Sequence, residues 1–189
     1  MKVTYISHSG FLIETKNCLF LFDYYEGKIP PLSQEKPLFI FVSHWHSDHF
    51  NPEIFSIRHE KVHYILSHDT RKHLPAGISP ENLCFMKPEE KLDFTLEDGN
   101  EHFTVETLKS TDCGVAFLIY YRRKYLYHAG DLNWWVWQGE TKQYNSNMTA
   151  NFLHYTKPLE NLDIWAAFLP LDPRQEEWYS KGFLHILEH

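Results

Sequence analysis

The stretch that decides the fold is Leu38-Phe39-Ile40-Phe41-Val42-Ser43-His44-Trp45-His46-Ser47-Asp48-His49. Its first five residues form a continuous apolar run, which is typical of a β-strand buried on both faces. Four polar residues follow within the next seven positions: His44, His46, Asp48 and His49. Imidazole nitrogens and carboxylate oxygens are the ligands that zinc and similar divalent metals prefer. The stretch therefore predicts a metal site at the end of a rigid strand.

The spacing of the four polar residues favours two adjacent ions. Side chains two positions apart in an extended segment point the same way, so His44 and His46 can hold one ion. Asp48 and His49 come where the chain turns toward Asn51-Pro52, a good helix start with Asn as the N-cap and Pro at the first position. There they can address a second ion. A loop of exposed polar residues is a poor alternative, because this pattern arises by chance only about once in a few hundred such chains.

Outward from this stretch, the chain shows many short strands and few helices. We expect strands at residues 3–6, 11–14, 18–22, 38–42, 62–66, 83–86, 102–108, 115–121, 125–128 and 164–169. We expect helices at residues 52–58, 70–73, 145–155 and 178–186. Since no repeat or linker interrupts this order, residues 1–186 are expected to form a single α/β domain.

The amino-acid composition bears on the cellular compartment in which the protein is expected. The 189 residues contain 43% hydrophobic residues, enough for a substantial core, but no apolar run of about 18 residues that could cross a membrane. The first residues lack the features of a signal peptide. The three cysteines are an odd number without a C-x-x-C pair, which favours a reducing compartment. We therefore expect a cytoplasmic protein.

The net charge of −7 bears on partners. A protein that grips nucleic acid normally presents a basic stripe, and the densest basic cluster here is Arg122-Arg123-Lys124. This cluster lies between two strand-like runs, so a solvated hairpin turn is a better interpretation than a phosphate grip. A small-molecule substrate is thus favoured over nucleic acid, and the oligomeric state stays open.

The last three residues, Leu187-Glu188-His189, match the beginning of a common C-terminal expression tag. We interpret residues 187–189 as an expression-tag scar and leave them out of the domain. The alternative, that the natural chain ends this way, stays open.

The residue 44–49 cluster resembles the signature of the metallo-β-lactamase superfamily. Asp131, in His128-Ala129-Gly130-Asp131, resembles the family's aspartate that bridges two metals, and Asp23 resembles the aspartate that supports the ligands from behind. Order and spacing agree over roughly residues 1 to 170. Within the superfamily, residues 110–117 and 129–135 are similar to a lactonase-like branch of bacterial metal-dependent hydrolases.

The resemblance implies an αββα sandwich, with or without the family's C-terminal strand, and one or two divalent ions. Zinc is expected first, with manganese or iron as alternatives. The family's third histidine for the first metal is absent, and we expect Asp112 to replace it, although Asp112 could instead be a turn residue. The family's last histidine ligand has only His185 as a counterpart, within a predicted helix, and we do not assign it. Whether the sequence stops before that ligand is open.

The expected activity is hydrolysis of a small ester, lactone or phosphodiester by a metal-activated water. Asp48 and Asp131 would orient the nucleophile and accept its proton. One alternative is a metal-binding protein of the same fold with an incomplete, inactive site. A second is an iron redox protein, which usually needs an electron-carrier domain for which this chain has no room.

Other candidates have two interpretations each. His8 could line the site or simply occupy a hairpin turn. The tryptophans could wall a substrate pocket or cover the core; they are Trp134, Trp135 and Trp137. Four further histidines are interpreted as structural: His63, His68, His73 and His128.

Overall fold

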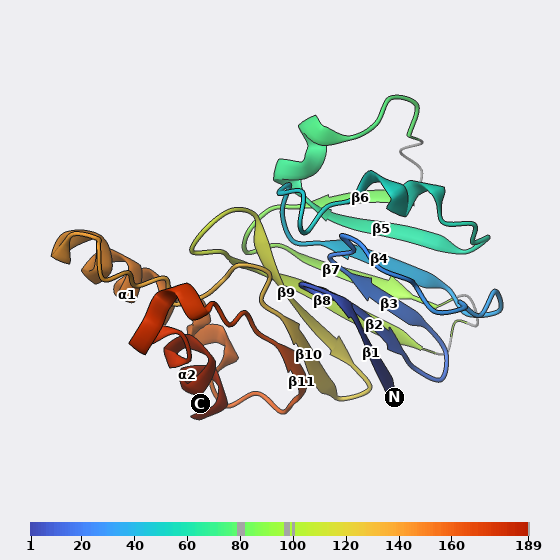
Figure 1. Cartoon of the computed structure of the whole chain (residues 1–189). Helices are drawn as coiled ribbons and strands as arrows, with labels where there is room; N and C mark the ends of the chain where they lie inside the picture. Colours follow the sequence, from blue (N-terminus) through green and yellow to red (C-terminus); the bar gives the residue numbers. More distant parts are fainter. Residues whose placement is uncertain (79–81, 97–98, 100, 189) are drawn as a thin grey trace. The chain divides into compact units, whose positions relative to one another are not determined.

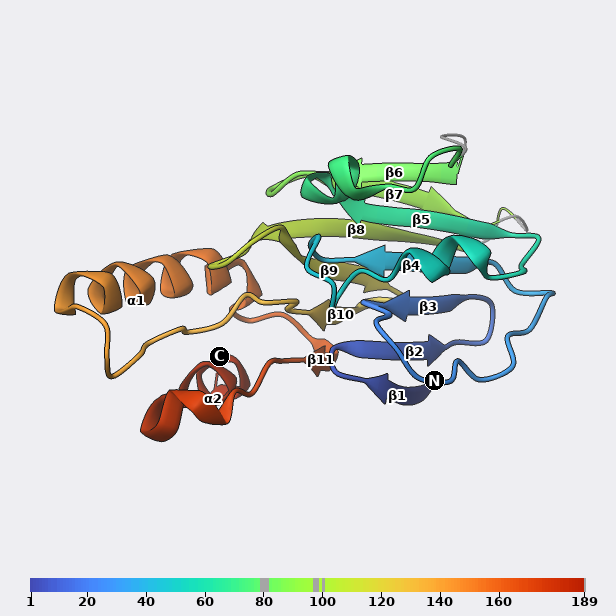
Figure 2. The ribbon, with the colours of Figure 1, turned by 45° about the horizontal axis from the view of Figure 1, so that its top comes forward.

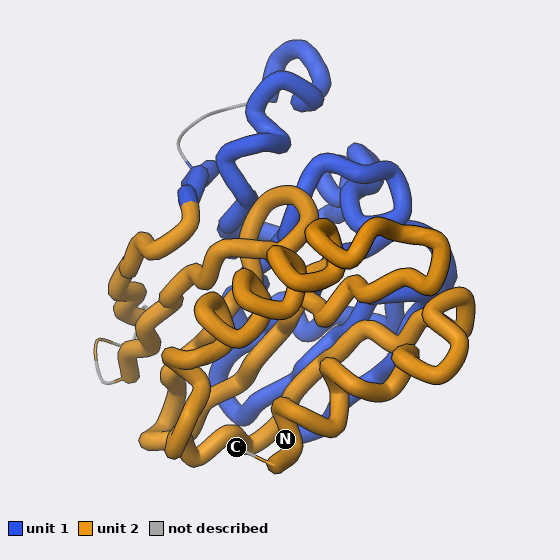
Figure 3. Tube along the Cα trace, turned by 90° about the vertical axis from the view of Figure 1, so that its left-hand side faces the viewer, with its two compact units in different colours: residues 1–87 blue, residues 88–189 orange. Residues whose placement is uncertain are grey.

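A computed structural model describes residues 1–78, 82–96, 99 and 101–188. The chain divides into two compact units, Met1–Lys87 and Pro88–His189, coloured separately in Figure 3. We describe each unit by itself, and the expectation of a single domain over residues 1–186 stays a prediction. His189 of the suspected scar lies outside the described residues. None of the helices in the described part of the chain is long and apolar enough to span a membrane.

The first unit is a six-stranded mixed sheet whose strands lie in chain order (Figure 1). The first three strands are antiparallel neighbours, and β3 to β6 are parallel. The strands predicted at residues 3–6, 11–14 and 18–22 are thereby confirmed as β1, β2 and β3. The strands are β1 (Lys2–Ser7), β2 (Gly10–Glu14), β3 (Leu19–Phe22), β4 (Leu38–Val42), β5 (Val62–Ser67) and β6 (Leu83–Met86).

Both faces of β3 and β4 are apolar, because every residue of these strands is hydrophobic and side chains alternate between the faces. On one face the aromatic rings of Phe22 and Phe41 stack with centroids 4.8 Å apart. The other face carries a cluster that includes Leu21, Ile40 and Ile54. All five residues of β4 are buried, as the apolar run predicts. A rigid central strand thus leads directly into His44.

Two short 3₁₀ helices lie within the described residues of the first unit, η1 (Pro52–Ser56) and η2 (His68–His73). Asn51 caps η1 as expected, since its side chain accepts a hydrogen bond from the Glu53 amide at 2.9 Å. The helix ends two residues earlier than predicted because Ile57 turns to an extended backbone and its amide bonds Ile54 O. The loop that carries Asp48 and His49 therefore enters a tight capped turn.

The second unit is a five-stranded mixed sheet in the order β11-β10-β9-β8-β7. Among the strands described for this unit, the β10–β11 pair is parallel and the other pairs are antiparallel. Between β9 and β10, Arg122 and Arg123 form the hairpin turn predicted from the basic cluster, both with positive φ. The strands are β7 (Lys91–Thr95), β8 (His102–Lys109), β9 (Val115–Tyr121), β10 (Lys124–His128) and β11 (Ile164–Phe168).

The helices of the second unit lie beyond the ends of β9–β11 (Figure 2). They are α1 (Lys142–Thr156), η4 (Lys157–Leu159), η5 (Pro173–Trp178) and α2 (Lys181–Glu188). Helix α1 begins three residues earlier than predicted because Thr141 caps it by accepting a hydrogen bond from the Tyr144 amide at 3.1 Å. Trp178, expected at the start of the last helix, belongs instead to η5. An apolar cluster that includes Leu118, Tyr127 and Phe152 forms this unit's core.

Candidate metal centre

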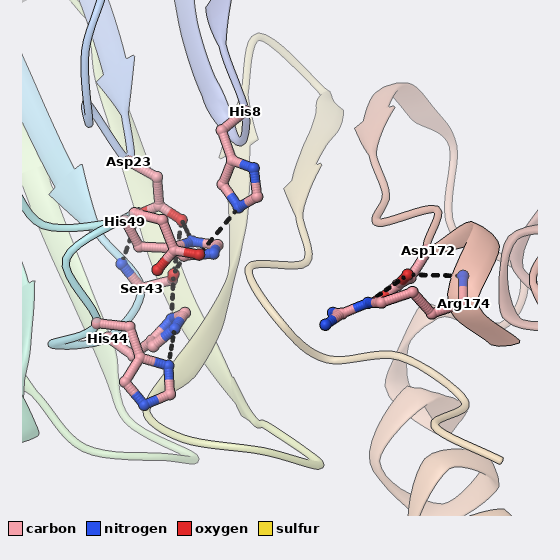
Figure 4. Close-up of polar contacts among 9 residues, drawn as sticks. His8, Asp23, Ser43, His44, His49, Asp172 and Arg174 are labelled. Atoms are coloured by element: carbon pink, nitrogen blue, oxygen red, sulfur yellow. Dashed lines mark hydrogen bonds and ion pairs between the residues drawn. The ribbon is translucent and has the colours of Figure 1, made fainter. Parts of the chain in front are cut away.

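A network of polar side chains begins where the parallel strands β3 and β4 end (Figure 4). Asp23 follows β3, and Ser43 follows β4. Oδ1 of Asp23 accepts a hydrogen bond from the Ser43 amide at 2.7 Å, and Oδ2 accepts one from the Ser43 hydroxyl at 2.6 Å. Both residues are fully buried. Because a buried carboxylate is costly unless it is hydrogen-bonded, this arrangement needs all its donors in place.

The network sets the tautomers of two buried histidines. Nδ1 of His49 lies 2.8 Å from Asp23 Oδ2, and since a carboxylate only accepts, His49 donates through Nδ1. Ser43 gives its single proton to Asp23, so its oxygen accepts from His44 Nδ1 at 3.0 Å. In the neutral form of both rings the Nε2 atom therefore carries the lone pair. That is the state a metal ligand needs, and backing by an acceptor behind the ring is the usual support of such ligands.

The donor geometry of His44 and His46 suits a divalent ion. Nε2 of His44 lies 3.0 Å from Nδ1 of His46. Two nitrogens bound to one tetrahedral zinc at 2.0–2.1 Å are about 3.3 Å apart. The two rings thus present their nitrogens at nearly the separation that a shared ion requires.

A second group of possible ligands in the first unit contains His8, Asp48 and His49. One ligand atom from each lies within 4.8 Å of the other two. Nε2 of His8 is 3.3 Å from Asp48 Oδ2, and the His8 ring meets the His49 ring edge-on at 5.2 Å. His8 lies in the β1–β2 turn and also beside Asp48 and His49. Its position is therefore compatible with both interpretations from the sequence, a residue that lines the site and a residue of a hairpin turn.

A hollow of about 550 Å³ opens beside His46 and Asp48. Trp45, which is 40% exposed, stacks on His73 with ring centroids 4.6 Å apart and planes 10° apart. The other lining residues are Ser47, Phe50 and Pro52. An aromatic wall beside candidate metal ligands is a suitable place for the apolar part of a small molecule.

In the second unit, Asp112 and Asp131 lie together. One carboxylate oxygen of each is within 4.8 Å of the other. Thr111 joins the two turns, because its hydroxyl donates to Asn133 O at 2.7 Å and accepts from the Asn133 amide at 3.1 Å. Two like charges at this distance repel each other unless a cation or a proton lies between them. The two carboxylates are thus close enough to share a cation, and their role as ligands stays a prediction.

Among the remaining candidates of the second unit, Trp134 and His185 pack against each other. Trp134 is buried and stacks on Phe152, and the His185 ring packs edge-on against Trp134 at 5.7 Å. This position agrees with leaving His185 unassigned. Elsewhere in the unit, Arg174 lowers the pKa of Asp172 by hydrogen bonding to its carboxylate (Figure 4).

Sequence reasoning missed two residues of the first unit. Ser43 was passed over, although its place between a buried strand and His44 is a usable signal. His73 was interpreted as structural, yet it lines the hollow and stacks on Trp45. Its signal is weak, because 24 residues with no ligand-like spacing separate it from His49.

Comparison with known proteins gives one curated relative. No protein-family model matches the chain. A UPF0173 metal-dependent hydrolase from Opitutus terrae is 29% identical over an alignment of 146 residues that covers 69% of this chain. The match spans 63% of that protein's length.

Solved structures give the fold. A variant of the β-hydroxylase CmlA matches with a TM-score of 0.59 and 12% identity, covering 98% of this chain and 43% of the other. The metallo-β-lactamase SMB-1, solved with mercaptoacetic acid, gives 0.51 and 14%, covering 95% and 83%. A protein from Parabacteroides distasonis, named as a metal-dependent hydrolase, gives 0.51 and 14%, covering 89% and 93%. At these identities the likeness concerns the fold alone: the chain has the α/β metallo-β-lactamase fold.

Proposed function

We propose that this chain, with its metallo-β-lactamase fold, is a metal-dependent hydrolase that acts on a small molecule. Its one or two divalent ions would be held by His44, His46, Asp48, His49, Asp112 and Asp131. The assignment of residues from both units to one centre rests on the sequence resemblance, and each unit contributes a group of ligands with suitable geometry of its own. The name of the curated relative supports the same class.

The observation that carries the proposal is the buried network of Asp23, Ser43, His44 and His49. A structural role alone would not require two buried imidazoles to be held with their Nε2 lone pairs on the side away from the network. Removing these polar groups from water has a free-energy cost, which a binding function explains. The network is therefore best understood as support for metal ligands.

The reaction would be hydrolysis of an ester, a lactone or a phosphodiester. A divalent ion supplies Lewis acidity, which brings the pKa of water down toward about 7 and stabilises negative charge on a carbonyl or phosphoryl oxygen. Asp48 and Asp131 would orient the attacking water and accept its proton. Asp48 suits this role because its side chain is 49% exposed and lines the hollow. Trp45 and His73 would contact the substrate's apolar part there.

We propose zinc as the first metal to test. Asp112 in place of a histidine makes the ligand set harder, so manganese and iron are the alternatives. A cytoplasmic location would suit a small-molecule hydrolase whose three cysteines are an odd number without a C-x-x-C pair.

The competing function is a metal-binding protein of the same fold without turnover. The observation that favours it is the sequence Ser110-Thr111-Asp112, which has no histidine where the resemblance expects one. The two functions make the same prediction for metal binding and differ in turnover.

The decisive test is metal content per chain, measured by elemental analysis after purification without added metal and again after zinc is supplied. We expect one to two equivalents in the wild type and a loss of at least one in His46→Ala. The matched control is His154→Ala, on an exposed face of α1. Turnover of an ester, lactone and phosphodiester panel then separates the hydrolase from the inactive protein. Wild-type protein that binds no metal even in excess zinc would rule out both.

A further inference from the structure

We propose that His8 is a metal ligand and completes, with Asp48 and His49, a three-residue site for a second ion within the first unit. The inference rests on the proposed function only for the presence of a divalent metal. It adds to the proposed ligand set a residue that comes from the β1–β2 turn, far in sequence from the residue 44–49 cluster.

The distances support this assignment. Nε2 of His8 is 3.3 Å from Asp48 Oδ2, close to the separation of about 3.3 Å between two ligand atoms on a tetrahedral ion. One ligand atom of each of His8, Asp48 and His49 lies within 4.8 Å of the others. The bond from His49 Nδ1 to Asp23 leaves His49 Nε2 as its ligand atom. His8 comes from the β1–β2 turn and His49 from the loop after β4, and the two rings lie close together (Figure 4).

The backbone conformation of the β1–β2 turn supports the same assignment for His8. His8 has φ +49°, in the left-handed region that side chains other than Gly, Asn, Asp and His rarely adopt. A Cβ at Gly10 would lie 2.8 Å from Ser7 O and 3.3 Å from Asp23 O. Only glycine therefore allows the turn to close against the chain at Asp23. Local strain of this kind persists where surrounding structure enforces it, and it concentrates at functional sites.

An ion pair between His8 and Asp48 explains the geometry less well. The two side chains are 48% and 49% exposed, and exposed pairs contribute little to stability. Such a pair would not offset the cost of the strained turn. As metal ligands, in contrast, His8, Asp48 and His49 leave a fourth tetrahedral position for water or substrate, which is the pattern of catalytic rather than structural zinc sites.

The test is zinc binding to metal-free protein, followed by isothermal titration calorimetry, with cobalt(II) absorption as a second readout. The variant is His8→Asn, because Asn tolerates the left-handed backbone at this position. The matched control is His102→Asn, an exposed histidine on β8. We expect two ions in the wild type and in the control. In His8→Asn the second ion should bind at least about tenfold more weakly. Even the loss of a residue that only hydrogen-bonds a metal ligand lowers metal affinity by about this factor. The visible bands of the second cobalt equivalent should also change.

A measurement on the wild type alone guards against misfolding of the variant. In protein labelled with ¹⁵N at histidine, the second equivalent of zinc should shift the Nε2 signals of His8 as well as His49. The inference would be overturned if folded His8→Asn bound the second ion with unchanged affinity, or if the ¹⁵N shift of His8 Nε2 did not change with zinc. Either result would leave the hydrolase proposal intact. A wild type that binds no zinc would overturn both.

Discussion

Ser43 is the residue on which the chemistry of the first unit depends most, although it would not itself contact a metal. Its hydroxyl donates to Asp23 and accepts from His44, and its amide also donates to Asp23. A small side chain with one donor and two acceptor lone pairs is the only kind that can do this in so little space. Ser43 thus fixes the tautomer of His44, the first of the proposed ligands, from the position just before it in the sequence.

Replacing Ser43 by Ala should weaken metal binding without unfolding the protein. His44 Nδ1 would lose its acceptor, so its ring could turn and exchange tautomers, and loss of such a partner typically costs 10–100-fold in metal affinity. Zinc titration of Ser43→Ala measures the effect, with far-UV circular dichroism to check the fold. Ser47→Ala, an exposed serine of the same loop, is the control and should bind zinc as the wild type does. Equal zinc affinities of the two variants would show that Ser43 does not support metal binding.

At the residue scale the sequence predicts identities better than contacts. The ligands His44, His46, Asp48 and His49 could be proposed from spacing, and their roles as ligands stay a prediction. The convergence of His8 with Asp48, and of His73 with Trp45, could not be foreseen. These contacts depend on turn geometry, such as the positive φ of His8, which a single sequence encodes only weakly.

At the scale of elements, the segment before β4 is tied to the end of β2. Lys36 Nζ donates to Glu14 Oε1 at 2.8 Å and to Thr15 O at 2.9 Å. The hydrogen bond and the charge of Lys36 lower the pKa of the Glu14 carboxyl. A depressed folded-state pKa means that the pair stabilises the fold above the unfolded pKa of about 4.3, and that this contribution is lost as pH falls through the folded value.

Lys36→Met should therefore lower the free energy of unfolding near pH 7 by no more than about 1 kcal/mol, since both side chains are partly exposed to solvent. The difference from the wild type should shrink below about pH 4, where Glu14 takes up a proton. Urea unfolding at pH 7 and pH 3 measures both effects. Lys16→Met, at an exposed position of the neighbouring turn, is the control. A deficit that is the same at both pH values would show that Lys36 acts through packing or the Thr15 carbonyl.

Elements with a strong hydrophobic pattern were predictable, and marginal ones were not. Strands β4, β6 and β9 have the bounds expected from the sequence, because each is an apolar run ended by polar residues. Strand β7 was missed: Lys91–Thr95 contains only Leu92 and Phe94 as apolar residues, and its pairing with β8 stabilises it. The helix at residue 52 was expected to be longer, since propensity does not reveal the turn at Ile57.

At the scale of the whole molecule, bound metal should stabilise the folded chain. An ion that binds only the folded state adds RT ln(1 + [L]/Kd), or about 2.7 kcal/mol when free zinc is 100 times Kd. For a chain of this length that corresponds to a rise in Tm of about 5–10 °C. Thermal unfolding with zinc and with a chelator measures the rise, which should be smaller in His46→Ala. An equal rise in both proteins would mean that zinc binds elsewhere.

The fold class was predictable at this scale because one short stretch carries most of the information. A buried strand followed by the residue 44–49 cluster points to two mixed sheets with few helices, as observed. The division into two compact units was not foreseen. Each unit has its own apolar cluster, and composition along the chain does not change at residue 87 in any way that marks the division.

The chain order of strands β1 to β6 has a consequence for biogenesis. Neighbouring strands in this sheet are successive in synthesis, so each can pair with the one made just before it, and the cost of closing the connecting loops rises only slowly with their length. We therefore expect His8, Asp23 and the residue 44–49 cluster to come together while the chain is still growing on the ribosome. Asp112 and Asp131 have not yet been made at that point. The first half of the proposed ligand set would thus be available to capture an ion co-translationally, before the second unit is made.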